Sequence, residues 1–399
     1  APLMQNSVNT VWRQVEQNGT EQEGWDMSTA LAASDVLERS YPSSLGEPYN
    51  DVFRLRADDF RDDSFMKRRA VAAVNTLAGG QNKRIAQLVV DTGSLAYVST
   101  AADYTHMAKA ETIMDTNELS GMGDRSFFLK PVNHESIAKD LANRGTLSGR
   151  PEKTYGYSSI GTDIAGFSAY RLNAIPTLAG SAAVGVTVTG DQSFVPSGST
   201  TNSDGTEVPV DYREATITVS ATADFARGTK FSIAGVKDVS QGNHIESERD
   251  ATFTVVEVID GTTMKIFPMP IAWDERPVAD GGSGALSAEQ AAYANVSTGF
   301  KGTDVLVVLN ATATKAIWQP DVFWTNDSVE IVAGDAPFEM MGDLDGFKVM
   351  KETLDSGSTV YIMWQGSIGA ATLDCRVFAW YGLVNRKPSH NGVALANFA

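Results

Sequence analysis

The chain has 399 residues, a formal net charge of −17 and 42% hydrophobic residues. This length exceeds what one hydrophobic core usually serves, so two or more domains are expected, and the composition is that of a protein folded throughout. The negative charge repels phosphate backbones and anionic lipid headgroups, which argues against tight binding of nucleic acid or of a membrane surface.

Cys375 is the only cysteine. An intrachain disulfide is therefore excluded, and synthesis in the cytosol is expected. Because Cys375 lies in a strand-like run, it is predicted to be a small buried hydrophobic residue rather than a nucleophile. The N-terminus has no basic region followed by an apolar run, so no secretory signal is expected. No stretch approaches the ~18 apolar residues of a membrane span.

Residues Val11 to Trp25 are predicted to form a long β-hairpin. On its first strand Val11, Arg13 and Val15 alternate with Trp12, Gln14 and Glu16, and Asn18-Gly19 is a strong turn dipeptide. Its far end is almost wholly polar, so the hairpin is expected to project from the body. Two interpretations stay open, a plain surface hairpin and an arm that contacts another molecule.

The strongest helical signal runs from about Asp59 to Asp91. Asp58 is predicted to cap this helix, and Asp63 to pair with Lys67 one turn on. A continuous helix here would be about 50 Å long at 1.5 Å per residue. Gly79-Gly80 falls near its middle, where each glycine costs roughly 1 kcal/mol, so a kink or break is predicted as one outcome.

The pattern from Tyr97 to Gly180 is mixed. Residues 105–118 are predicted to be helical, 126–129 to form a strand, and 133–144 to form a second helix capped by Asn133.

From Ser181 the hydrophobic period changes to two. Four strands are predicted at 184–189, 215–220, 252–258 and 264–267, the last two joined by a turn at Asp260-Gly261. Gly281–Gly284 is predicted to be a flexible linker that ends this all-β segment. Inside it, Pro196 to Arg213 is a long polar loop.

After the linker, a short helix capped by Ser287 is predicted at 287–294. Apolar runs then indicate strands, several of them buried on both faces. They lie at 305–309, 322–324, 329–332, 360–364 and 377–380.

A search for chemistry finds little. The four histidines have no zinc-site spacing and are expected to be solvated or capping residues. Phosphate loops, nucleophile elbows and dinucleotide fingerprints are missing from the sequence. The acidic pairs Asp58-Asp59 and Asp62-Asp63 suit a helix N-terminus better than a hydrolase site, and no metal or cofactor is expected.

Several strings resemble the coat proteins of short-tailed bacteriophages of the Salmonella-phage type. They occur in the family's order from about Asn9 to the C-terminus. They are Asn9–Trp12, Val15–Gln17, Gln22–Asp26, Gly46–Pro48, Leu55–Asp59, Gln192–Phe194, Ala234–Lys237, Tyr293–Val296, Val322–Trp324 and Trp380–Gly382.

The resemblance implies an α+β protein with the tailed-phage and herpesvirus capsid fold. That fold has peripheral and axial domains, a long spine helix and a projecting hairpin, here with an inserted Ig-like or β-barrel domain. The implied division is an N-terminal segment with the hairpin (1–45), a peripheral domain with the spine helix (46–105), the first part of the axial domain (106–180), the inserted domain (181–285) and the return of the axial and peripheral domains (286–399).

The resemblance also implies a function. Such a chain would be a structural major capsid protein, not an enzyme, that self-assembles into hexamers and pentamers of an icosahedral shell around double-stranded DNA. Its partners would be copies of itself, a scaffolding protein, a portal protein at one vertex and DNA bound without sequence specificity. No membrane is implied, and the protein would be assembled in the bacterial host cytoplasm and reside in the virion.

Three sets of candidate residues follow from the resemblance. The hairpin contact within a capsomer would use Trp12, Gln17, Asn18, Gly19, Glu21 and Trp25. The loop contact between capsomers would use Asp204, Glu207, Asp211 and Arg213, although this loop has no lysine between Asp204 and Asp211 where the family mixes both signs. The spine-helix charges are Asp62, Asp63, Lys67 and Arg68.

A secreted Ig-like binding or adhesion module is the alternative function. The predicted β domain would suit it, but the missing signal and the mixed flanks argue against it. A carboxylate hydrolase would need two acids facing one cleft, which the acidic pairs do not indicate.

Overall fold

The computed structural model describes residues 10–15, 25, 39–56, 58–119, 125–143, 163–201, 204–205, 207–240, 242–312, 317–333, 348–353, 359–367, 369 and 371–396. Within them the protein is a mixed α+β chain, in agreement with the expected class. Two compact units are present, and the chain passes between them several times. Unit 1 comprises 1–12, 42–85 and 329–384, and unit 2 comprises 13–41, 86–328 and 385–399.

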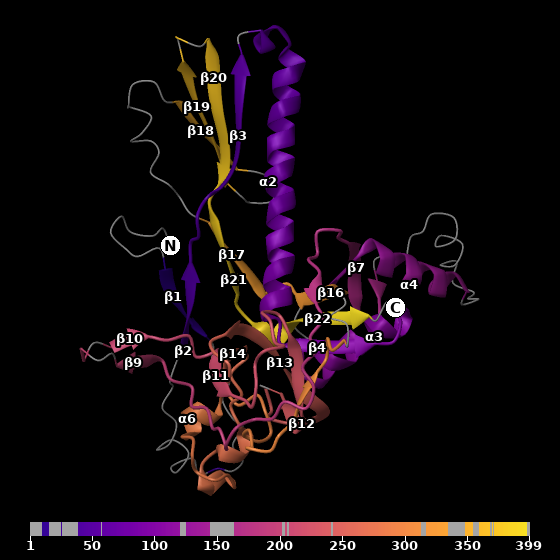
Figure 1. Ribbon diagram of the computed structural model, residues 1–399, viewed down its shortest axis with the longest axis vertical. Coiled ribbons are helices and arrows are strands. Elements are labelled where there is room, and N and C mark those ends of the chain that lie inside the picture. Colours follow the sequence, from indigo (N-terminus) through magenta and orange to yellow (C-terminus); the bar gives the residue numbers. More distant parts are fainter. Residues whose placement is uncertain are drawn as a thin grey trace. The chain divides into compact units, whose positions relative to one another are not determined.

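Unit 1 packs a long helix against an antiparallel sheet (Figure 1). The helix is α2 (Asp63–Thr92), whose last turns belong to unit 2. The sheet has the order β18-β19-β20-β3, and a two-stranded sheet joins β17 to β21. The strand bounds are β3 Tyr49–Arg56, β17 Val329–Ala333, β18 Lys348–Thr353, β19 Thr359–Ser367, β20 Thr372–Ala379 and β21 Tyr381–Asn385.

The core of unit 1 lies between α2 and the sheet. Ala73 and Leu77 of the helix are buried against Val360 and Val377 of the strands. The helix runs without a break through Gly79-Gly80, so of the outcomes left open by the sequence the continuous helix is the one observed. It begins after Asp62 rather than near Asp58, because Asp62 Oδ1 accepts a hydrogen bond from the Ser64 amide at 2.9 Å. Asp58 makes no capping bond, so its predicted role was wrong.

Unit 2 contains a larger mixed sheet covered by two helices. The strand order is β4-β22-β16-β5-β7-β6, with β8 also paired to β16. The pairs β22–β4 and β5–β7 are parallel, and the other pairs are antiparallel. The bounds are β4 Leu95–Ser99, α3 Tyr104–Thr116, β5 Arg125–Leu129, α4 Pro131–Asn143, β6 Asp163–Ile164, β7 Phe167–Arg171, β8 Leu178–Ala179, β16 Ile317–Thr325 and β22 Asn391–Ala396.

Helices α3 and α4 bury their apolar sides on this sheet. Met107, Met114 and Ile137 pack with Phe127 and Phe323 in one cluster. Every residue of β22 is buried, as expected for a central strand covered on both faces.

A second sheet in unit 2 is antiparallel, with the order β11-β14-β13-β12-β15. Its core is an apolar cluster around Phe231, Phe253 and Ile266. The bounds are β9 Ser199–Thr201, β10 Glu207–Pro209, β11 Ala215–Thr218, β12 Lys230–Val239, β13 Glu246–Val258, β14 Thr263–Phe267, α6 Ala288–Ala291 and β15 Leu306–Val308; short 3-10 turns lie at Asp59–Arg61, Trp273–Glu275, Val278–Asp280 and Pro388–His390.

Two expectations for this region were wrong. Residues 184–189 form no strand, because Gly185 takes a positive φ of 67° and only isolated bridges at Thr187 and Val188 follow. Gly281–Gly284 is no flexible linker, because backbone hydrogen bonds fold it onto the segment from Asp274 to Val278. The same apolar cluster continues through Phe300 and Leu306, so position 285 is no break in packing. The five-part domain division stays a prediction.

A strand pair involves the N-terminal segment. β1 (Thr10–Val15) pairs with β2 (Arg39–Ser44). The turn at Asn18-Gly19 and the second strand of the predicted hairpin lie outside the described residues, apart from Trp25. That hairpin therefore stays a prediction.

Candidate assembly surfaces

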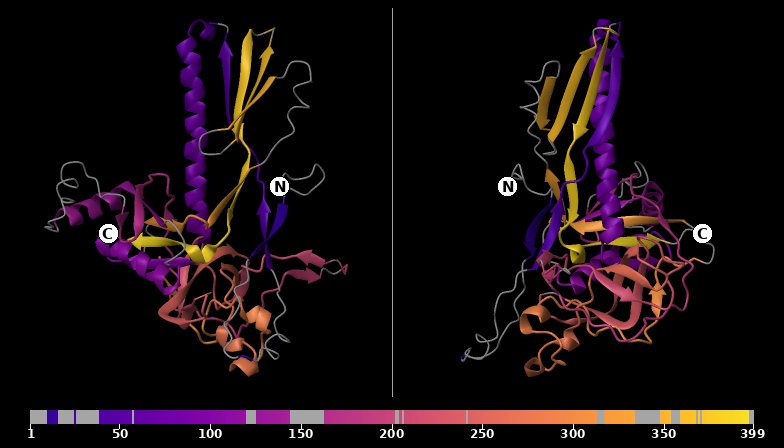
Figure 2. Two further views of the ribbon diagram at one scale, coloured as in Figure 1. Left: turned by 180° about the vertical axis from the view of Figure 1, so that it is seen from behind. Right: turned by 60° about the vertical axis from the view of Figure 1, so that its left-hand side comes forward.

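The polar loop from Pro196 to Arg213 contains a small hairpin. β9 and β10 pair with Glu207 opposite Thr201 and Pro209 opposite Ser199. Asp204 is exposed at its tip, next to Gly205 with a φ of 84°. In Figure 1 and in the left view of Figure 2 this hairpin leads away from the five-stranded sheet of unit 2. The hairpin therefore carries Asp204 at an exposed position, and the Glu207 side chain lies outside the described part.

The base of this loop has a different character. Asp211 and Arg213 are both largely buried and form a two-pronged ion pair, with Nε to Oδ1 at 2.8 Å and Nη2 to Oδ2 at 2.7 Å. Arg213 Nη1 also donates to the carbonyl oxygen of Asn385. Of the four predicted loop residues, the structure thus separates an exposed tip at Asp204 from a buried pair that is satisfied within the chain.

The predicted hairpin contributes two described tryptophans. Trp12 lies half-buried on β1, whereas Trp25 is fully exposed. An exposed indole is unusual without a binding partner, since tryptophan is favoured at interfaces. Gln17, Asn18, Gly19 and Glu21 lie outside the described residues.

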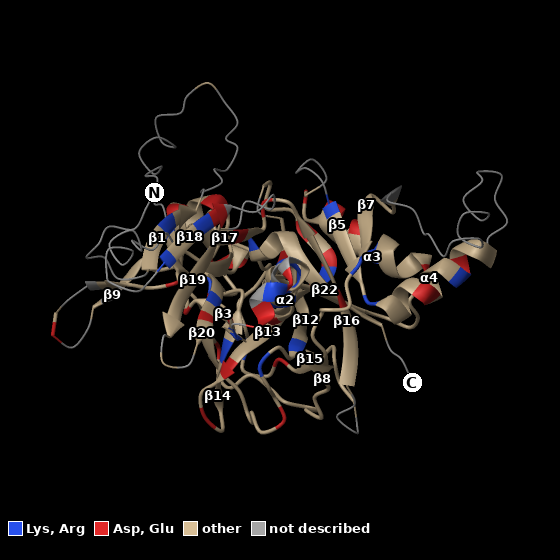
Figure 3. Ribbon diagram, turned by 90° about the horizontal axis from the view of Figure 1, so that it is seen from above, with Lys and Arg blue, Asp and Glu red and all other residues tan. Residues whose placement is uncertain are grey.

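The charges at the start of α2 form a local network rather than a contact site. Asp62 pairs with Arg68 at 3.1 Å, and Arg68 Nη1 donates to Ser64 Oγ at 2.7 Å. The hydrogen bond from the Ser64 hydroxyl, more than any other contact, holds the pKa of Asp62 below its usual value. Lys67 is exposed, and the side chain of Asp63 is not described, so the Asp63–Lys67 pair stays a prediction. Figure 3 shows both signs of charge at α2.

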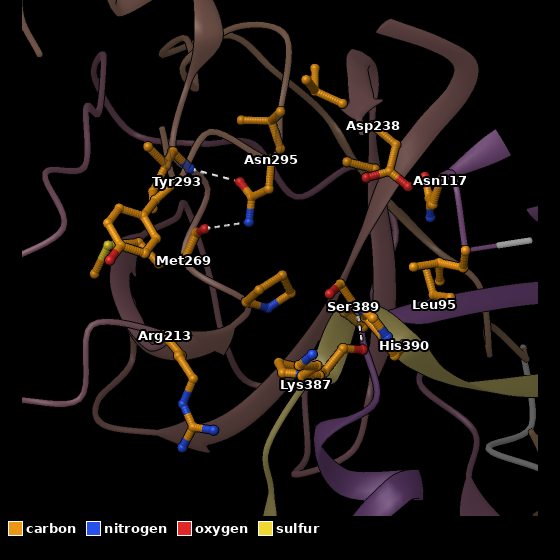
Figure 4. A pocket seen from close by; sticks show the side chains of 18 of the residues that line it. Leu95, Asn117, Arg213, Asp238, Met269, Tyr293, Asn295, Lys387, Ser389 and His390 are labelled. Atoms are coloured by element: carbon orange, nitrogen blue, oxygen red, sulfur yellow. Dashed lines mark hydrogen bonds between the residues drawn. The ribbon is translucent and has the colours of Figure 1, made fainter. Parts of the chain in front are cut away.

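A cavity of about 560 Å³ lies within unit 2. Figure 4 shows its mixed lining, which includes Arg213, Asp238, Asn295, Lys387 and His390. Asn295 Oδ1 accepts a hydrogen bond from the Ile271 amide, and Asn295 Nδ2 donates one to the Met269 carbonyl oxygen, both at 2.9 Å. Asp238 is likewise paired with Arg249. Nothing in the described lining pairs a nucleophile with a base.

A second cavity, of about 480 Å³, lies in unit 1 between α2 and the sheet. Its lining is mostly apolar and includes Val71, Val74, Ile362 and Cys375. Burial raises the pKa of the Cys375 thiol, which disfavours the reactive thiolate. The prediction that Cys375 is a buried hydrophobic residue is confirmed.

The histidines were misread from the sequence. All four are buried, and none is solvated. His106 lies 3.2 Å from Asp321, which also accepts from the Lys130 amide at 2.7 Å and from Asn133 Nδ2 at 2.6 Å. Asn133 is thus inside α4 and bonded to Asp321, not the helix cap. His106 and Asp321 are 215 positions apart, so no local signal could have linked them.

Lys230 is a further buried polar group that sequence reasoning missed. It is 0% exposed at the start of β12. Its position in an apolar strand was the only local signal, and a lysine there is more often exposed.

Two searches over the described residues give no result. No group of three or more histidine, cysteine or acidic residues there could hold a metal ion. No helix among them combines the length and the apolar character that a membrane crossing requires.

Comparisons with known proteins give a consistent set of matches. A family model described as P22 coat protein, gene protein 5, matches residues 1–397. The solved CUS-3 coat protein I-domain is 30% identical over 32% of this chain and 96% of its own, with a TM-score of 0.24. The capsid of Cyanophage P-SCSP1u is 10% identical over 98% of this chain and 85% of its own, with a TM-score of 0.44. A chain from Mycobacterium phage Che8 is 9% identical over 97% and 84%, with a TM-score of 0.41.

Proposed function

Because this chain belongs to the P22 coat protein family and is a major capsid protein of a bacteriophage virion, we propose that it assembles as hexamers and pentamers of an icosahedral shell. The observation that carries the proposal is the family match over residues 1–397. Many modest interfaces closed into a shell give stability without any single tight contact.

The family's capsid fold is proposed for this chain in detail. Helix α2, which packs on the sheet of unit 1, would be the spine helix of the peripheral domain. The five-stranded sheet with its own apolar cluster would be the inserted β domain. The seven-stranded sheet with α3 and α4 would belong to the axial domain.

Two contacts between subunits are proposed. Within a capsomer, the hairpin that carries Trp12, Gln17, Asn18, Gly19, Glu21 and Trp25 would lie on the adjacent subunit, and the full exposure of Trp25 supports this. Between capsomers, the tip of β9–β10 with Asp204 and Glu207 would meet basic residues of another capsomer. Exposed ion pairs there would contribute about 0.2 to 1 kcal/mol each, so they would orient subunits more than hold them.

The remaining partners follow the family. A scaffolding protein would direct assembly in the bacterial host cytoplasm, a portal protein would occupy one vertex, and the shell would enclose double-stranded DNA. The net charge of −17 supports a shell that does not bind tightly to the enclosed DNA, because like charges repel. An enzymatic role is not proposed, since Asp59 accepts a hydrogen bond from the Arg56 amide at the end of β3 and Asp62 accepts one from the Ser64 amide at the start of α2.

Electron microscopy of the purified full chain tests this function directly. The protein would be imaged alone and with a scaffolding protein, alongside sedimentation analysis. Closed shells or spirals of regular capsomers are expected. Discrete monomers under both conditions would oppose the proposal.

A pair of variants tests the hairpin contact. Trp25→Ala should reduce shell yield without changing the unfolding of the monomer, because the indole is exposed. Val184→Ala removes another exposed apolar side chain, 87% exposed and outside both proposed contacts, and should leave assembly unchanged. Equal shell yields for the two variants would count against the hairpin contact.

A further inference from the structure

Arg213 occupies the point where the β9–β10 loop returns to the five-stranded sheet. Its guanidinium holds Asp211 with two parallel hydrogen bonds, and its backbone amide donates to the same carboxylate at 3.1 Å. The side chains are only 10% and 15% exposed, so the pair is screened from solvent and more strongly coupled than a surface pair. The end of the loop is therefore fixed to Arg213.

The remaining face and edge of the same guanidinium reach two other segments. Its centre lies 4.7 Å from the ring of Tyr41 on β2 and 5.7 Å from that of Phe267 on β14. Its Nη1 donates to the carbonyl of Asn385 at the end of β21. The Arg213 guanidinium thus joins the loop to Asn385, 172 positions later in the chain, and to Tyr41, about as many positions earlier.

β2 also contacts the other end of the loop. A Cβ atom built on Gly198 would lie 3.2 Å from Arg39 Nη1, so the backbone of Gly198 passes close to that side chain. The Arg39 amide donates to the Tyr293 hydroxyl at 3.1 Å, and the Tyr293 ring packs on Tyr212 with centroids 5.3 Å apart. Both ends of the loop are consequently seated against β2, which follows the predicted N-terminal hairpin.

We propose that Arg213 is a positioning residue for assembly, which holds the β9–β10 hairpin in a fixed orientation on β2 and thereby couples the two proposed contact elements. This inference rests on the proposed capsid function. A planar fork is needed, because it must bond two carboxylate oxygens and a carbonyl while its face lies on an aromatic ring. Lysine would keep the charge but not these directions.

The first test compares backbone protection in the unassembled full chain. Hydrogen–deuterium exchange would be measured on Arg213→Lys and on Arg227→Lys, whose parent arginine is 66% exposed and pairs with Asp91. In Arg213→Lys, amides in both 199–209 and 39–44 should exchange about tenfold faster, as for one lost charge-assisted bond. Strand β13 should not change in either variant, and Arg227→Lys should match the parent chain throughout.

A second variant separates the two connections. Asp211→Asn removes the carboxylate but keeps the guanidinium on Tyr41, so exchange should rise in 199–209 and not in 39–44. A rise confined to the loop in Arg213→Lys, or an equal rise that includes β13, would overturn the proposal. The first result would show no coupling, and the second only a general loss of stability.

The assembly measurement decides the role in function. The shell yield of Arg213→Lys should fall at least about threefold at equal protein concentration, since a mobile loop adds an ordering cost to each contact. Unchanged yield despite faster exchange would also overturn the proposal. Failure of the parent chain to form shells would count against the capsid function instead, and the exchange data would still decide whether Arg213 positions the loop.

Discussion

The Nζ atom of Lys230 lies 3.2 Å from the carbonyl oxygen of Gly93, the first residue after helix α2. It also donates to Thr254 Oγ1 at 2.7 Å. Burial lowers the pKa of Lys230 to about 7, and the charge of Asp91 opposes this only in part. A buried amine at the negative end of a helix is thus held by hydrogen bonds rather than by a contacting carboxylate.

Replacing this amine with an apolar side chain should not destabilise the protein. In Lys230→Met the Gly93 carbonyl keeps a donor, because Thr254 Oγ1 lies 3.1 Å away. We expect the free energy of unfolding at pH 6 to be unchanged or to rise by ~1–3 kcal/mol, as for other buried charges replaced by hydrophobic groups. Urea unfolding measures this, and a loss above ~2 kcal/mol would contradict it.

The same lysine predicts a pH dependence on the alkaline side. Its folded pKa of about 7 lies below the ordinary 10.5, so the unfolded chain binds more protons between these values. Stability should therefore rise as pH increases from 7 toward 10, by up to ~1.4 kcal/mol per pH unit from this group. The difference between the parent chain and Lys230→Met isolates the effect, and parallel pH curves would refute it.

His390 predicts a loss of stability in acid. Burial, followed by the charge of Lys387, lowers its pKa from 6.5 to about 4. The unfolded chain therefore takes up a proton first, and stability that is present above pH 6.5 is lost as pH falls toward 4. His390→Asn should flatten the melting temperature against pH over this range. Several carboxylates also titrate in acid, so the deciding measurement is the difference in melting temperature between the parent chain and His390→Asn at each pH.

Asp321 should be among the most sensitive positions in unit 2. It is fully buried and accepts bonds from Lys130, Asn133 and His106, so Asp321→Ala leaves three donors without this acceptor. We expect a cost of at least ~3 kcal/mol. Asp327→Ala is the control, because its carboxylate is 79% exposed and 4.0 Å from Arg386. Similar urea midpoints for the two variants would contradict the network.

The start of α2 offers a direct comparison of two candidate caps. Asp62→Ala removes the bond to the Ser64 amide and should lower stability by ~1 kcal/mol. Asp58→Ala removes no capping bond and should change it by less than ~0.5 kcal/mol. Chemical unfolding of unit 1 measures both losses. A larger loss for Asp58→Ala than for Asp62→Ala would instead support Asp58 as the helix cap.

Short-range sequence patterns correctly predicted several of the helices and strands. The helices at α2, α3 and α4 and the strands β11, β13 and β14 follow from apolar periodicity and turn residues, and Ser287 caps α6 as expected. Residues 184–189 alternate like a strand but fail, because the backbone of Gly185 turns into the left-handed region. Val186 and Val188 are buried as the alternation indicated, but Val184 is exposed and the backbone forms no strand.

The candidate surfaces show a different limit. Asp211 and Arg213 look like free charges in a polar loop, yet they neutralise one another two positions apart and become the loop's anchor. Their burial depends on Tyr41 and Asn385, which are distant in sequence. Composition predicted a polar loop from Pro196 to Arg213, and Asp204 is exposed there, but its role as a contact comes from the family resemblance and stays a prediction.

Cys375 gives the molecule a built-in reporter. It is the chain's single thiol and lies on β20 in the apolar cavity of unit 1. The residue is 7% exposed, so the access of a thiol-specific reagent depends on how closely the helix and the sheet pack around that cavity. The rate of labelling therefore reports on the packing of unit 1, without any engineered probe, before and after the subunit joins a shell.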